Sequence, residues 1–259
     1  MIPTTPSPQS THRGYVAAAY ATPTQTGRRV DLGVSRVAVR FEMEPAVDGW
    51  NIVLLGAWNP AILTPPWLAK HVLDADSVPV ELSLSLGSIE ERQISFPDHG
   101  FRLAVQPGKL VLTPFSLNHA HIIKAQTVAV VLLEKLSHTP VSGVGVNYRF
   151  AHRGALAAAE PVFDLPDSDG LVELGLAVRQ TQVIRKLEGV AIFGRPLLNL
   201  RMTSDLDDGE IRFDLNYHYA VESADVAAKK LAGAFEGLVD HAKHIVFGYS
   251  TVEVTYDNK

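Results

Sequence analysis

Hydrophobic and polar residues alternate along most of the chain. Runs of this kind occupy residues 36–43, 80–86, 101–105 and 110–112 in the first half, and 172–178, 198–202 and 211–219 in the second. Alternation with a period of two gives a strand one buried and one wet face, which is typical of antiparallel sheet. Asp207-Asp208-Gly209 predicts a hairpin turn between the last two runs.

The pattern changes to helical spacing in three segments. Thr64 is a suitable N-cap, with Pro65 as first residue, for a helix that runs to Leu73. Residues 119–136 are apolar almost all round, so this helix is expected to lie between other layers. A third helix is predicted from a cap at Ser223 to Ile245, with one apolar stripe.

The order of these elements suggests an internal duplication. Gly108-Lys109 opens a strand that is followed by a helix and a strand at 144–150. Gly209-Glu210 opens the same sequence of elements, which closes with a strand at 251–256. The chain is therefore predicted to be an α+β protein with antiparallel sheets and two similar β-β-β-α-β halves. Because this order is common, coincidence is the alternative interpretation.

Four segments follow from this interpretation. They are an N-terminal arm (1–29), a first α+β half with an extra hairpin and short helix (30–153), a linker (154–170) and a second α+β half (171–259). The arm is rich in Pro, Thr, Ser and Ala, a composition that does not build a core. It carries three arginines and no acidic residue. The net charge of the whole chain is -5, so residues 30–259 carry -8.

Composition removes several classes of function. The chain has no cysteine, which excludes disulfides, thiolate catalysis and cysteine-ligated metals. The acidic balance gives no general attraction to nucleic acid. The longest apolar run, residues 128–133, is too short to cross a bilayer, and no secretory signal is recognisable. We therefore expect a cytoplasmic protein with no membrane partner.

The usual catalytic and metal motifs are missing or incomplete. There is no Gly-x-Ser-x-Gly, and Gly143-Val-Gly145 is half a dinucleotide motif that leads into a strand. His241 and His244 lie one turn apart and could share a metal, but histidines near a helix C-terminus also complement its dipole. No third ligand follows from the spacing, so neither a metal nor another cofactor is expected.

Aromatic residues indicate candidate partner-binding positions. Trp58-Asn59-Pro60 and Trp67 lie on a proline-rich stretch that could form a rigid lip for a partner. The alternative is a covering loop that closes the core. In the arm, Arg13, Tyr15 and Tyr20 could anchor the segment on the acidic body of a second copy, so we expect the arm to contribute to self-association.

These observations favour a non-enzymatic interaction or assembly protein that is homo-oligomeric, with a protein partner also compatible. The alternative is a small-molecule-binding protein or enzyme with a pocket between the two halves. Its polar candidates are His119, His121, Tyr148, Arg149 and His218. Nucleic-acid binding ranks third, because acidic residues dilute the arginines on the strand faces predicted to be wet.

Overall fold

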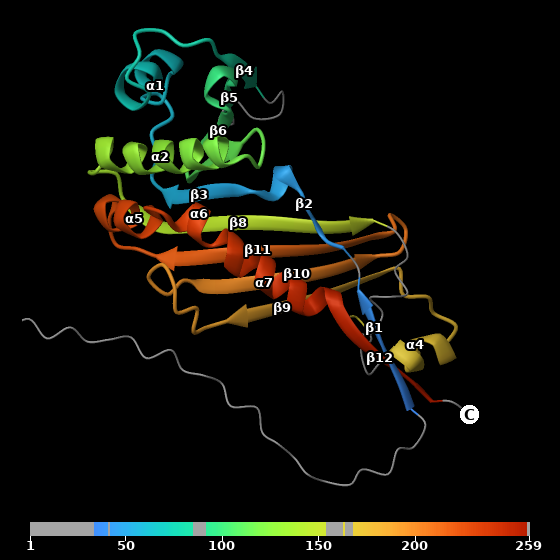
Figure 1. Cartoon of the computed structure of the whole chain (residues 1–259). Coiled ribbons are helices and arrows are strands. Elements are labelled where there is room, and N and C mark those ends of the chain that lie inside the picture. Colours follow the sequence, from blue (N-terminus) through green and yellow to red (C-terminus); the bar gives the residue numbers. More distant parts are fainter. Residues whose placement is uncertain (1–33, 41, 85–91, 154–162, 164–167, 258–259) are drawn as a thin grey trace, which may run out of the picture.

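The computed structural model describes residues 34–40, 42–84, 92–153, 163 and 168–257 (Figure 1). Its main feature is a ten-stranded antiparallel sheet with the order β4-β5-β6-β7-β3-β8-β11-β10-β9, with β2 paired to β8. A separate two-stranded sheet pairs β1 with β12. The chain is therefore an α+β protein with antiparallel sheet, as the sequence predicts.

The strands of the first part are β1 (Val34–Arg40), β2 (Glu44–Pro45), β3 (Asn51–Gly56), β4 (Glu81–Leu84), β5 (Arg92–Phe96), β6 (Phe101–Gln106), β7 (Lys109–Pro114) and β8 (Val141–Arg153). Those of the second part are β9 (Gln180–Leu187), β10 (Leu197–Asp205), β11 (Glu210–Ala220) and β12 (Thr251–Asp257). Short 3-10 turns, η1 (Val47–Gly49) and η2 (Pro97–His99), precede β3 and β6.

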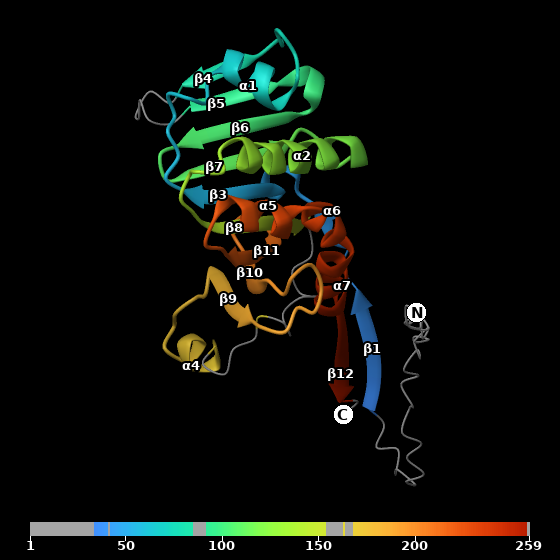
Figure 2. The ribbon, with the colours of Figure 1, turned by 90° about the vertical axis from the view of Figure 1, so that its left-hand side faces the viewer.

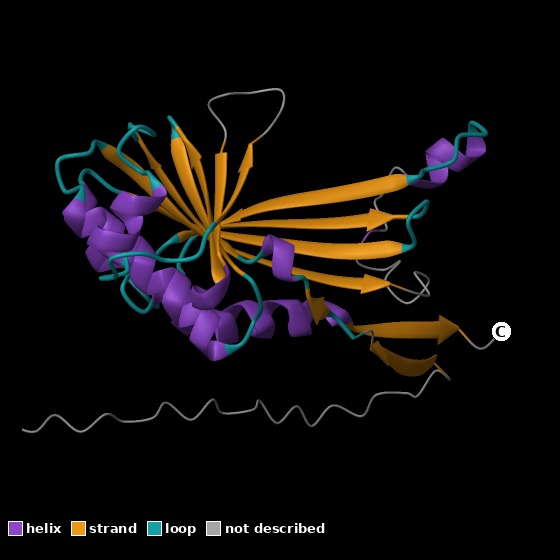
Figure 3. Cartoon of the chain, turned by 90° about the horizontal axis from the view of Figure 1, so that it is seen from above, coloured by secondary structure: helices purple, strands orange, loops and turns teal. Residues whose placement is uncertain are grey.

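The helices lie mainly on one face of the large sheet. They are α1 (Pro65–Val72), α2 (His119–Lys135), α4 (Ser168–Glu173), α5 (Ala224–Leu231), α6 (Ala234–Gly237) and α7 (Val239–Ser250). Figure 2 shows α1, α2 and α5 in front of the strands, and Figure 3 shows most helical turns gathered on one side of them. Within the described part of the chain, no helix is long and apolar enough to span a bilayer.

Helix α2 lies at the centre of the hydrophobic core. It contacts β3, β6 and β7 of the sheet, and α1, α5 and α6 beside it. Ile122, Val128 and Leu132 are buried, and Val130 and Val131 are half-buried. Its apolar surface is therefore covered on several sides, as expected from its composition.

Local signals in the sequence place several element ends correctly. The Thr64 hydroxyl accepts a hydrogen bond from the Trp67 N–H at the start of α1, and the Ser223 hydroxyl does the same for Val226 at the start of α5. Residues 206–209 turn β10 into β11, and Gly209 has a positive φ of 61° that suits glycine. Capping and turn chemistry are local, so the sequence alone defines them.

Two predicted elements are wrong. The run at 172–178 is not a strand: α4 ends at Glu173, and Leu174 and Leu176 are exposed in the segment that follows. The strand of this region is β9, whose polar composition hides it. The predicted helix from Ser223 to Ile245 is divided into α5, α6 and α7, because Gly233 adopts a left-handed conformation with φ 76°.

The strand order does not show an internal duplication. In the first half, α2 connects β7 to β8, and both strands belong to the large sheet with β3 between them. In the second half, the strand after the helices is β12, which pairs with β1 outside that sheet. The arm (1–29) and most of the linker (154–170) lie outside the described residues.

Candidate functional site

The face of the large sheet opposite the helices is polar over β8, β11 and β10. On each of these strands, apolar side chains point to the helices and alternate with polar ones on the other side. The strands pair in register over most of their length, so polar residues from separate parts of the chain form rows across the sheet. We call this surface the open face.

Four asparagines form one of these rows. Asn51, Asn147, Asn216 and Asn199 are paired neighbours on β3, β8, β11 and β10. The Asn199 amide donates to the Asn216 carbonyl oxygen at 3.0 Å, Asn216 to Asn147 at 2.5 Å, and Asn147 to Asn51 at 2.7 Å. All donors run in one direction, so each bond polarises the next. Each amide keeps a second N–H and a second lone pair for another partner.

Two glycines of β8 leave room for this row and for its neighbour. A Cβ at Gly145 would lie 3.0 Å from Nδ2 of Asn216, and a Cβ at Gly143 would lie 2.9 Å from Cε1 of His218. Gly143-Val-Gly145, which resembled part of a dinucleotide motif, therefore accommodates polar side chains of β11 on the open face.

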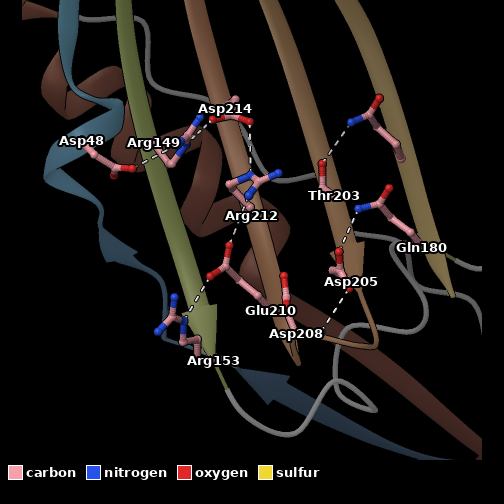
Figure 4. Close-up of polar contacts among 11 residues, drawn as sticks. Asp48, Arg149, Arg153, Gln180, Thr203, Asp205, Asp208, Glu210, Arg212 and Asp214 are labelled. Atoms are coloured by element: carbon pink, nitrogen blue, oxygen red, sulfur yellow. Dashed lines mark hydrogen bonds and ion pairs between the residues drawn. The ribbon is translucent and has the colours of Figure 1, made fainter. Parts of the chain in front are cut away.

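A chain of ion pairs lies beside the asparagine row (Figure 4). Acidic and basic side chains alternate along it, and the contacts range from 2.6 to 3.5 Å. Its members are, in order, Asp48, Arg149, Asp214, Arg212, Glu210 and Arg153. Three carboxylates balance three guanidinium groups, so this part of the open face has little net charge to attract a charged ligand.

Arg149 is held by neighbours on several sides. Its side chain lies against Gly49, where an added Cβ would come within 2.1 Å of the Arg149 Cβ. The indole N–H of Trp50 donates to the Arg149 carbonyl oxygen at 2.9 Å. Partial burial by itself lowers the pKa of Arg149, but the hydrogen bond and charge of Asp214 outweigh it, so the pKa is raised.

The open face is hollowed at two places. A hollow of about 670 Å³ lies between the segment 42–48 and the ends of β8 and β11, and it includes Arg153 and Glu210. A second hollow of about 310 Å³ has the asparagine row as its floor and Arg149, Arg201 and Ile184 at its sides. Residues of both predicted halves line each hollow. Their amide and charged groups can hydrogen-bond a polar ligand.

Exposed apolar side chains occur in and beside β9, the edge strand of the sheet. Ile184 in β9 is 63% exposed, and Leu174 and Leu176 in the preceding segment are 76% and 55% exposed. Leu206, 52% exposed, is tied to the start of β9 by a hydrogen bond from its N–H to the Arg179 carbonyl oxygen. Exposed apolar side chains beside an unpaired sheet edge are candidates for a contact surface.

The structure places the predicted partner-binding residues as follows. Trp58 is buried, and its indole N–H donates to the Leu54 carbonyl oxygen at 2.9 Å. Trp67 is half-buried against the core, and Asn59 is exposed. The two tryptophans therefore pack against the core. Arg13, Tyr15 and Tyr20 lie outside the described residues.

The predicted pocket residues do not converge. His119 and His121 lie at the start of α2, where His119 pairs with Glu236 at 2.5 Å and His121 hydrogen-bonds Ser116. Tyr148 points into the core and donates to the Phe235 carbonyl oxygen.

Arg149 and His218 lie on the open face. The lining of the 310 Å³ hollow on this face includes Tyr148 and Arg149 but none of His119, His121 and His218.

No group of three or more metal-ligating side chains occurs in the described part of the chain. His241 instead hydrogen-bonds the Tyr217 hydroxyl at 2.8 Å. Burial, and then the neighbouring charge of His244, lowers the pKa of His241. His241 therefore packs against Tyr217 of β11, whereas His244 is exposed.

Comparison of the chain with models of known protein families finds no match, and no curated protein is similar to it in sequence.

The asparagine row and the apolar β9 end were missed at the level of sequence. Asn216 is visible as a wet position of an alternating run, but pairing it with Asn51, Asn147 and Asn199 requires the strand order. Ile184 lies in Gln180-Thr-Gln-Val-Ile-Arg-Lys-Leu187, whose polar residues weaken the strand signal.

Proposed function

We propose that this protein is a non-enzymatic interaction protein that self-associates through the apolar surface at the β9 end of its sheet. The observation that supports this proposal is the exposure of Leu174, Leu176, Ile184 and Leu206 before, in and beside the edge strand β9. Contact with a second copy would remove these side chains from water and contribute about 25 cal/mol for each Å² of apolar surface buried.

The polar surface supports a binding role over a catalytic one. A catalytic site needs a nucleophile or base placed beside a free acceptor or donor. On the open face, the charged groups of the ion-pair chain are already matched to each other, and the amides of the asparagine row bond one another. Groups arranged in this way position a partner better than they transfer protons.

The direct test is the molar mass of the full chain by light scattering over a series of concentrations. We expect a dimer or larger species at micromolar concentration. A chain that stays monomeric throughout the series contradicts the proposal. Removing residues 1–27 separates the contribution of the arm: association should weaken but persist, because the β9 end remains.

A second candidate function rests on the hollow above the asparagine row. Free donors and acceptors on four adjacent amides, with Arg201 at the side, would suit a small neutral or singly anionic ligand with several hydrogen-bonding groups. A ligand that stays bound to wild-type protein through purification, but not to an Asn147→Leu variant, supports this candidate. Identical ligand content in both proteins contradicts it.

A further inference from the structure

The two edges of the large sheet differ in their capacity to pair with another strand. At one edge β4 has four residues, and at the other β9 has eight. Exposed edges are commonly protected by short strands, proline or bulges. β9 has no proline and pairs with β10 without a bulge over all eight residues. Among the described residues, nothing pairs with the outer side of β9.

The antiparallel orientation of the strands determines how a strand of a second copy would add to the sheet. Every pair in the large sheet is antiparallel. A twofold axis beside β9 would place β9 of a second copy antiparallel to the first, so the alternation would continue across the boundary. Such a contact uses the same surface on both copies and closes as a dimer.

We propose that two copies of this chain join through antiparallel β9–β9 pairing, with Ile184 at the twofold axis. This inference rests on the proposed self-association and specifies its interface. The paired edges would satisfy the outward backbone groups of β9. The Ile184 side chains would lie next to each other on the joined open faces, which removes the exposed apolar residue from water.

Charge selects this register over its neighbours. In a twofold antiparallel pair of β9 strands, the residue at the axis lies opposite the same residue of the second copy. Centring on Arg185 or Lys186 would place like charges directly opposite each other, which is destabilising.

Centring on Ile184 places Arg185 opposite Val183 of the second copy, and Lys186 opposite Gln182. Centring on Val183 would place Ile184 opposite Gln182 of the second copy, so less of the apolar surface of Ile184 would be buried.

Among the described residues, no strand occupies the outer edge of β9. On the helix side, Arg185 lies over the Tyr249 ring at 5.7 Å and donates to its hydroxyl at 3.2 Å. The Arg185 side chain is therefore held against α7 and does not extend over the outer edge of β9. Leu174 and Leu176 precede β9, and Leu206 lies beside its first residues, where they can flank the two ends of the joined strands.

The absence of cysteine permits a clean crosslinking test. An Ile184→Cys variant has one thiol per chain, and directly opposed residues in an antiparallel pair have Cα atoms about 4.5–5.5 Å apart, within disulfide range. Mild oxidation should give a covalent dimer. Gln180→Cys is the matched control on the same face of β9, because its copy would lie about 27 Å away along the strands. Leu82→Cys tests the β4 edge.

Crosslinking of Ile184→Cys alone supports the proposal. No crosslink at this position, or an equal crosslink of Gln180→Cys or Leu82→Cys, overturns it. An Ile184→Lys variant adds an independent reading: its dimer dissociation constant should rise about tenfold or more, while Leu82→Lys stays dimeric. Unchanged melting temperatures of the monomeric forms would show that both variants fold.

The outcomes also separate this interface from self-association in general. A wild-type dimer that neither crosslinks at residue 184 nor responds to Ile184→Lys rejects the β9 interface and leaves self-association standing. A wild-type chain that is monomeric throughout rejects both.

Discussion

Replacing Gly49 by alanine should disturb the part of the open face that holds Arg149. The added Cβ would come 2.1 Å from the Arg149 Cβ and 2.9 Å from its Cδ. The nearest atom is a Cβ fixed to the backbone, so rotation of the arginine does not relieve the clash.

Overpacking of this kind costs about 1–3 kcal/mol, and weakening of the half-exposed Arg149–Asp214 pair adds about 0.5–1 kcal/mol. The free energy of unfolding should therefore fall by about 1.5–4 kcal/mol, which lowers the melting temperature by roughly 3–16 °C.

Thermal unfolding followed by circular dichroism measures this change. Gly108→Ala is the matched control, because nothing lies within 4 Å of a Cβ at that position, and its melting temperature should stay close to wild type. In an Arg149→Gly background the added cost of Gly49→Ala should disappear, because the opposing Cβ is gone. Equal melting temperatures for Gly49→Ala and Gly108→Ala would refute the close approach of residues 49 and 149.

Three further substitutions test the core, the asparagine row and the burial of His241. Leu132→Ala, in the fully buried part of α2, should lower the free energy of unfolding measured in urea by about 2–5 kcal/mol. Val131→Ala, at a half-buried site of the same helix, should lower it clearly less. Equal losses would mean that α2 is not packed as described. Asn216→Leu removes two bonds of the asparagine row and should cost about 1–2 kcal/mol by the same measurement, and no loss would show that water replaces them fully. Burial lowers the pKa of His241, so the unfolded chain binds a proton at this histidine at higher pH than the folded chain does. The free energy of unfolding should therefore fall as the pH drops below about 6.5. His241→Gln should flatten that fall between pH 7.5 and 5.5, and an unchanged slope would contradict the burial of this ring.

The sequence was sufficient where structure depends on local chemistry. The caps at Thr64 and Ser223 and the alternation of β11 each depend on residues close together in the chain, so they could be predicted. β9 could not, because Gln, Thr, Arg and Lys occupy an edge strand that needs little apolar surface. The predicted strand at 172–178 was wrong for the opposite reason. Leu174 and Leu176 alternate with polar residues as in a half-buried strand, but both are exposed.

The candidate site depends on strand order, which no local pattern contains. Asn51 and Asn199 become members of one row only because β3, β8, β11 and β10 are neighbours in the sheet. The ion-pair chain likewise joins Asp48 to Arg149 across about a hundred positions of sequence. Alternation predicted which residues are wet, but not which of them meet.

Native mass spectrometry of the purified full chain is the sharpest test of self-association, because one spectrum reports both the assembly and any retained ligand. We expect a species at twice the chain mass of 28.1 kDa, with no added small molecule. A species at the mass of a single chain that carries a bound ligand would contradict it, and would favour a small-molecule-binding protein that uses the hollow above the asparagine row.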